Sequence, residues 1–69
     1  MTQILEEQIL EFVQNRHKKG ESTASRHIHI RFDIEINEAE EILENLATNG
    51  KISKSYDAEY QENRYSQNQ

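Results

Sequence analysis

The chain has 69 residues and a net charge of −5, from 13 acidic and 8 basic side chains. A chain this short buries roughly 60% of its unfolded surface, so we expect one compact domain without an enclosed substrate pocket. The absence of cysteine and proline excludes disulfides, thiolate metal sites and polyproline motifs. No apolar run exceeds two residues and no basic region opens the chain. We therefore expect neither a membrane span nor a signal peptide, and predict a cytoplasmic protein.

The charges are unevenly distributed along the chain. Residues 1–15 contain three acids and no base, whereas residues 16–31 contain five bases and one acid. Residues 33–44 then contain six acids and no base. Such blocks predict a domain with two faces of opposite sign.

The first predicted helix covers residues from about 3 to 18. Its apolar side chains recur at helical spacing, so they form one stripe with two marginal members. The stripe consists of Leu5, Ile9, Phe12 and Val13, with Ile4 and Leu10 at its margins. Basic residues at positions 16–19 suit the negative end of a helix, and Gly20 follows as a stop.

The segment 21–36 is compatible with two structures. Polar and apolar residues alternate from Arg26 to Ile36, which by itself indicates a strand. The alternative is a helix from about 23 to 33 that begins at Ser22 or Thr23 as N-cap. That helix would place three apolar side chains, Ala24, Ile28 and Phe32, on one face. It would also leave Ile30 on the solvent side.

The third predicted helix covers residues from about 37 to 49. Its stripe consists of Ala39, Ile42, Leu43 and Leu46. Asn37 is the expected N-cap, and the glutamates of the first turn complement the helix dipole. Asn49 and Gly50 supply a left-handed stop.

A β-hairpin is expected over residues from about 51 to 67. Two short stretches, 51–56 and 63–67, contain β-branched or aromatic residues and are separated by a polar run. We expect a loose tip between them and a frayed end at residues 67–69. The predicted fold class is mainly α with a small β-hairpin.

This order of elements resembles a winged helix-turn-helix domain of the small prokaryotic regulator type. Members typically run Thr-Ala-Ser into the second helix, close it with an apolar, small, apolar triplet, and end the third helix in Gly before the wing. The matching residues here are Thr23-Ala24-Ser25, Ile28, Phe32-Asp33-Ile34, Ala39, Ile42-Leu43, Leu46 and Gly50-Lys51-Ile52. The resemblance covers nearly the whole chain as a single domain, 1–69, and favours the helix for residues 23–33.

The resemblance implies a regulator that acts on DNA or on the transcription apparatus. In that family the third helix enters the major groove, the second crosses the phosphate backbone, and the wing touches an adjacent groove. The implied nucleic-acid contacts are the basic residues Arg16, Lys18, Lys19, Arg26, Arg31, Lys51, Lys54 and Arg64.

An alternative function follows from the acidity of the third helix. Its outer face carries Asn37, Glu41, Glu44 and Thr48. Carboxylates near phosphates repel them and release no counterions, so this face suits a basic protein partner without nucleic acid. Exposed Ile30 would then serve as a partner contact or in a homodimer.

No catalytic, cofactor or metal site is expected. His27 and His29 point about 200° apart on a helix, and share a face only on a strand. No carboxylate accompanies a nucleophile in a recognisable pattern, and Gly20 and Gly50 are too far apart for a phosphate loop. We therefore predict that the protein is not an enzyme and takes no small-molecule substrate.

Overall fold

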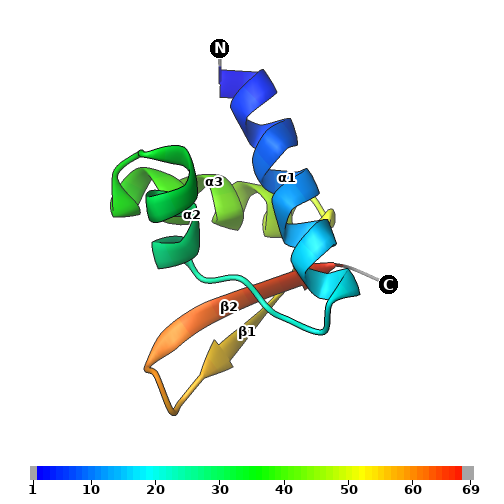
Figure 1. Ribbon diagram of the computed structural model, residues 1–69, viewed down its shortest axis with the longest axis vertical. Coiled ribbons are helices and arrows are strands. Elements are labelled where there is room, and N and C mark those ends of the chain that lie inside the picture. Colours follow the sequence, from blue (N-terminus) through cyan, green and yellow to red (C-terminus); the bar gives the residue numbers. More distant parts are fainter. Residues whose placement is uncertain (1, 68–69) are drawn as a thin grey trace.

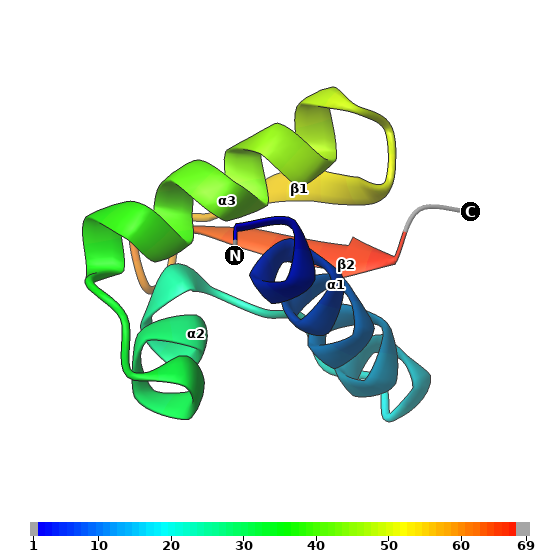
Figure 2. The same cartoon turned by 90° about the horizontal axis from the view of Figure 1, so that it is seen from above.

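The computed structural model describes residues 2–67, with side chains from residue 4 onward. The elements follow in the order α1 (Thr2–Lys18), α2 (Ser25–Phe32), α3 (Ile36–Thr48), β1 (Ile52–Asp57) and β2 (Glu62–Gln67). The fold is mainly α with a small antiparallel hairpin, as predicted, and is compatible with a winged-helix layout. The closed end of the hairpin projects away from the helices (Figure 1). Seen from above, β1 lies nearer α3 and β2 nearer α1 (Figure 2).

Helix α2 confirms the helical prediction for the ambiguous segment. Ile28 is completely buried, whereas Ile30 is 78% exposed. A strand would have put both side chains on one face. Phe32 reaches the core margin, where its ring meets that of Phe12 edge to face at 5.7 Å between centroids.

The predicted N-caps of α2, Ser22 and Thr23, are wrong. The cap is Ala24, because Thr23 is drawn into the sheet instead. Backbone N–H groups of Thr23 and Tyr65 each donate to the other's carbonyl at 2.7 Å. The Thr23 hydroxyl accepts from Arg16 Nε at 3.1 Å. These bonds hold Thr23 in an extended conformation, so the helix starts only after Ala24.

His27 caps α2 in place of a hydroxyl. The N–H of Ala24 donates to His27 Nδ1 at 2.9 Å, so this nitrogen must be unprotonated. The pKa of His27 is lowered by burial of the ring and then by the positive charges of Arg16, Arg26 and Arg64, against an opposing effect of Glu62. The start of α2 thus depends on a neutral imidazole.

Helix α3 begins slightly earlier than predicted, and Asn37 is not its N-cap. Asp33 adopts the left-handed conformation, with φ of 56°, and closes α2. Ile34 then packs against the core, so the chain enters the helix directly after Glu35, whose carbonyl accepts from the N–H of Ala39. The C-terminal stop is confirmed, since Gly50 has φ of 76°.

The core draws on all five elements. The three predicted helical stripes supply most of it, and each strand of the hairpin adds one side chain. The buried members are Ile9, Val13, Ile28, Ala39, Ile42, Leu43, Leu46, Ile52 and Tyr65. Burying each large side chain contributes about 1.5 to 3 kcal/mol, which makes this cluster the main source of stability.

The hairpin is better ordered than predicted. Its strands pair from Ile52↔Gln67 to Asp57↔Glu62, so Gln67 is not frayed, whereas residues 68 and 69 lie outside the described residues. At the tip, Asp57 Oδ1 accepts from the N–H groups of Glu59 and Tyr60 at 2.9 and 3.3 Å. The expectation of a loose tip is therefore wrong, because a carboxylate organises the turn.

Tyr65 fastens the hairpin to α3. Its ring is completely buried, and its hydroxyl lies 2.8 Å from Glu40 Oε1 and 2.9 Å from Glu44 Oε2. Burial and the two carboxylates raise the pKa of Tyr65 far above its ordinary value. Asn63 Nδ2 also donates to Glu40, and Lys54 forms an ion pair with Glu44. Glu40 and Glu44 lie one helical turn apart on the same side of α3, and together they contact three side chains of the hairpin.

Replacing Tyr65 by Phe should lower the free energy of unfolding by about 1 to 3 kcal/mol, because both carboxylates lose their shared donor while the apolar packing remains. Urea unfolding followed by circular dichroism measures the change. Tyr60→Phe is the matched control, since Tyr60 is exposed. An equal effect of the two changes would contradict the fastening role of the Tyr65 hydroxyl.

The cap on α2 predicts a pH dependence of stability. Below about pH 6.5 His27 is protonated in the unfolded chain, whereas in the folded chain its lowered pKa keeps the imidazole neutral to a lower pH. The free energy of unfolding should therefore fall as the pH drops through that region. In His27→Gln the slope should flatten, because a Gln oxygen can accept the same N–H without titrating.

His17→Gln, at the end of α1, is the control for replacing a histidine outside the cap. Unfolding is measured at pH values above those where Glu44 and Glu62 titrate, since ion pairing lowers the pKa of both carboxyls. A parent slope that survives in His27→Gln would show that the cap is not its source.

Candidate functional site

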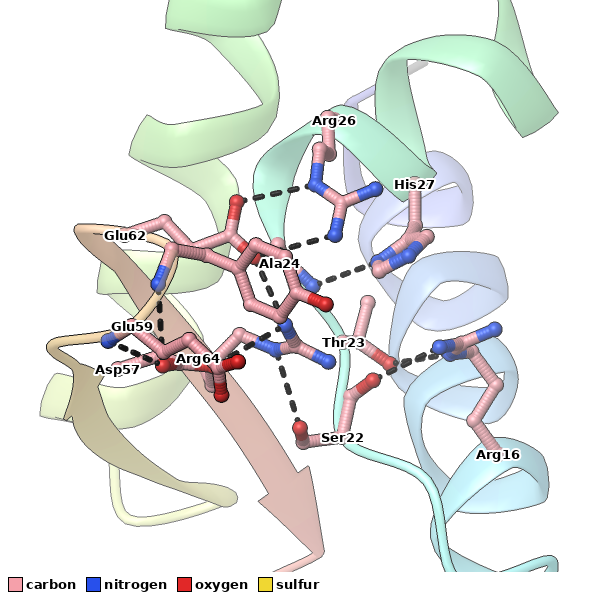
Figure 3. A network of polar contacts seen from close by, with 11 residues as sticks. Arg16, Ser22, Thr23, Ala24, Arg26, His27, Asp57, Glu59, Glu62 and Arg64 are labelled. Carbon is pink, nitrogen blue, oxygen red and sulfur yellow. Dashed lines mark hydrogen bonds and ion pairs between the residues drawn. The ribbon is translucent and has the colours of Figure 1, made fainter.

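Three of the predicted nucleic-acid contacts, Arg16, Arg26 and Arg64, gather where the hairpin meets the start of α2 (Figure 3). Arg16 Nη2 donates to the carbonyl of Ser22 at 2.8 Å, and Arg64 Nε donates to the Ser22 hydroxyl at 3.0 Å. Arg26 reaches from the first turn of α2 toward Glu62 on β2. We call these three residues the arginine cluster.

Carboxylates from the same chain compensate the arginine cluster. Arg26 Nε lies 3.0 Å from Glu62 Oε1, and Arg64 Nη1 lies 2.7 Å from Glu62 Oε2. Arg16 pairs with Glu21 at 3.4 Å. The hydrogen bond with Arg26 holds the pKa of Glu62 below its ordinary value, and that of Arg26 above it. An incoming anion would therefore have to displace existing ion pairs.

The other predicted basic contacts do not join the arginine cluster. Lys54 is bound to Glu44 on the α3 side of the hairpin. Arg31 borders a groove between α1 and α2, where its guanidinium lies 5.4 Å from the Phe32 ring centroid. Lys51 borders a depression next to Glu6, while Lys18 and Lys19 are exposed at the end of α1. The eight basic residues thus form several separate groups.

The exposed surface of α3 carries acidic side chains and no basic one. The helix carries four glutamates and no basic residue. The exposed positions of this region are Glu35, Ile36, Asn37, Glu38, Glu41, Asn45 and Thr48. Within residues 2–67 neither Glu38 nor Glu41 forms an ion pair. Glu44 lies between this surface and the hairpin, where Lys54 and then Tyr65 lower its pKa. We call Glu38 and Glu41, with Glu44 at the margin next to the hairpin, the acidic face.

The groove between α1 and α2 has a volume of about 330 Å³. Phe12 and Phe32 form its apolar part, and four polar side chains, Gln8, Glu11, Asn15 and Arg31, line the remainder. It is an open surface feature in which Arg31 and Glu11 supply opposite charges. Such mixed lining gives it no preference for a ligand of one sign.

The two histidines of α2 form hydrogen bonds with backbone groups. His27 caps the helix, and His29 Nδ1 meets the carbonyl of Ile34 in the following turn. Within the described part of the chain, no three His, Asp or Glu residues lie in a group that could hold a metal ion.

None of the helices in the described part of the chain combines the length and the apolar character needed to cross a bilayer.

Two tyrosines of the hairpin were not singled out from the sequence. Tyr56 and Tyr60 are 64% and 62% exposed, and the guanidinium of Arg26 lies 5.8 Å from the Tyr60 ring centroid. Their only sequence signal was an aromatic residue in a polar segment. Register decides the environment of Tyr56, which lies opposite Asn63 on the side of the hairpin that faces α3.

Comparisons with known proteins do not assign a function to these surfaces. No family model, no curated protein and no solved structure matches the chain.

Proposed function

We propose that the chain is a small winged-helix module that binds a positively charged protein partner through the acidic face of α3. The observation that carries the proposal is the charge of this helix: four glutamates and no base, with Glu38 and Glu41 exposed and outside any ion pair within residues 2–67. Uncompensated carboxylates attract basic partners, speed their association and exclude acidic ones.

The geometry of α3 supports this use of the helix. Tyr65, Asn63 and Lys54 hold its inner margin to the hairpin, so the helix is fixed in place before any partner arrives. A rigid surface loses little entropy on binding. Glu41, one turn from Glu44, lies on the side away from the core.

A second candidate is binding of DNA phosphates by α2 and the hairpin, as a small regulator of transcription. It is favoured by the convergence of Arg16, Arg26 and Arg64 at the start of α2 (Figure 3). Against it stands the compensation of that cluster by Glu21, Glu62 and Asp57. The acidic face would also repel the phosphates of any duplex into which α3 was inserted.

Two titrations distinguish the candidates. The protein is titrated with a fluorescent lysine-rich peptide and, separately, with a short random-sequence duplex DNA, each at low and moderate salt. Partner binding by the acidic face predicts binding of the peptide that weakens with salt, and no binding of the duplex even at low salt. Salt-dependent binding of the duplex without binding of the peptide would establish the second candidate instead.

Charge reversal of the acidic face should weaken peptide binding. In Glu38→Lys/Glu41→Lys we expect about a tenfold loss of affinity, because two attractive charges become repulsive. The matched control is Glu7→Lys/Glu59→Lys, which changes the net charge equally at exposed sites outside α3. An equal loss in both variants would show that only the net charge matters and that α3 is not the binding surface.

If DNA is bound, the basic residues are tested in the same way. Charge reversal of Lys18 and Lys19 removes exposed positive charge without breaking an ion pair within residues 2–67. It should abolish duplex binding if the end of α1 contributes phosphate contacts. Unchanged duplex affinity in this variant would exclude Lys18 and Lys19 from the contact surface.

A further inference from the structure

The two outer edges of the hairpin differ, because only β2 pairs with another segment of the described chain. The sheet has the order β1-β2, and the outer edge of β2 is covered where Thr23 pairs with Tyr65. No strand covers the outer edge of β1 within residues 2–67. The side chains of Lys54, Ser55 and Tyr56 on β1 are all exposed. An open strand edge is a template for pairing with another chain.

The register identifies the backbone groups at this open edge. Tyr65 directs both its N–H and its carbonyl to Thr23, hence away from β1. In an antiparallel pair of strands, opposed residues that are hydrogen-bonded to each other alternate with opposed residues that are not. Lys54, opposite Tyr65, belongs to the second kind, so its backbone N–H and carbonyl point away from β2. The same holds for Tyr56, opposite Asn63. Lys54 and Tyr56 therefore present a spaced pair of donors and acceptors to solvent.

The surroundings of this edge are acidic on the α3 side. Lys54 and Tyr56 direct their side chains to the same side of the sheet as Tyr65, whose hydroxyl meets Glu40 and Glu44. Lys54 is paired with Glu44, whereas Glu40 accepts hydrogen bonds from Asn63 and Tyr65 and forms no ion pair within residues 2–67. A strand added to β1 would extend the side of the sheet that faces these two glutamates.

We propose that the open edge of β1 binds an extended, basic peptide segment of the partner as an added strand, with its lysine or arginine side chains toward the α3 glutamates that face the hairpin. Backbone pairing at Lys54 and Tyr56 would supply affinity, and the α3 carboxylates would supply the preference for positive charge. Tyr56 would offer its exposed ring to a neighbouring cation. This proposal rests on the function proposed above and specifies how the partner is held.

A second copy of this chain is a poorer occupant of the same edge. Each copy carries a net charge of −5 and would bring its own α3 to the shared sheet. The two acidic faces would then repel each other, since like charges at close range oppose association. Electrostatic repulsion therefore disfavours a second copy of this chain at the β1 edge, whereas a basic segment of a partner is attracted to it.

The test uses the full ¹⁵N-labelled chain and two probes: a short capped peptide of alternating lysine and valine, and the same peptide N-methylated at every residue. N-methylation keeps the charge and removes every backbone donor. We expect the unmethylated peptide to bind about tenfold more tightly and to slow amide exchange at Lys54 and Tyr56. In the free protein these two amides should exchange faster than those of Ser55 and Asp57, which face β2.

A variant removes one of the pairing groups from the protein side. Tyr56→Pro deletes an N–H that faces solvent, which an edge strand tolerates, whereas Tyr56→Ala keeps that N–H. Tyr56→Pro should weaken binding of the unmethylated peptide more than Tyr56→Ala does, and should leave binding of the methylated peptide closer to that of Tyr56→Ala. The probe comparison decides the question even if the Pro variant does not fold.

The remaining outcomes overturn the proposal in distinguishable ways. Equal affinity for the two peptides would refute strand addition while leaving charge-based binding by α3 intact. Binding of neither peptide would refute both proposals. A dimer in analytical ultracentrifugation, with Lys54 and Tyr56 amides protected before any peptide is added, would show that a second copy occupies the edge.

Discussion

The attachment of Tyr65 is the contact on which the rest of the structure depends. Its backbone pairs with Thr23, its ring closes the core, and its hydroxyl meets two glutamates of α3. One residue therefore joins the connection before α2, the hairpin and the third helix. In a chain of 69 residues, where no disulfide can contribute, such multiple use of one side chain compensates for a small core.

Most charged side chains near the hairpin are likewise used for contacts within the chain. Arg16 and Arg64 hold Ser22 from two sides, and Glu62 binds both Arg26 and Arg64, so residues that suggest a phosphate site in the sequence serve as internal links. Ion pairs of this kind position the hairpin more than they stabilise it, because they are partly exposed. The charge left over for an outside partner is negative and lies on α3.

Helical periodicity predicted most of this fold, because the buried stripes of α1 and α3 follow directly from residue spacing. It failed at Thr23 and Asn37, where long-range pairing with Tyr65 and the packing of Ile34 override local capping preference. For the candidate site, the acidity of α3 was evident from composition. The neutralisation of Arg26 by Glu62, 36 positions away, and the open edge of β1 required the register of the hairpin.

That register also restricts how the chain can change length over evolutionary time. Side chains alternate between the two sides of a strand, so one residue inserted between Glu62 and Tyr65 would turn the tyrosine ring out of the core. An insertion within the turn at residues 58–61 leaves the pairing of β1 with β2 unaffected. Descendants of this sequence should therefore vary in length at the hairpin tip while the spacing within both strands stays constant.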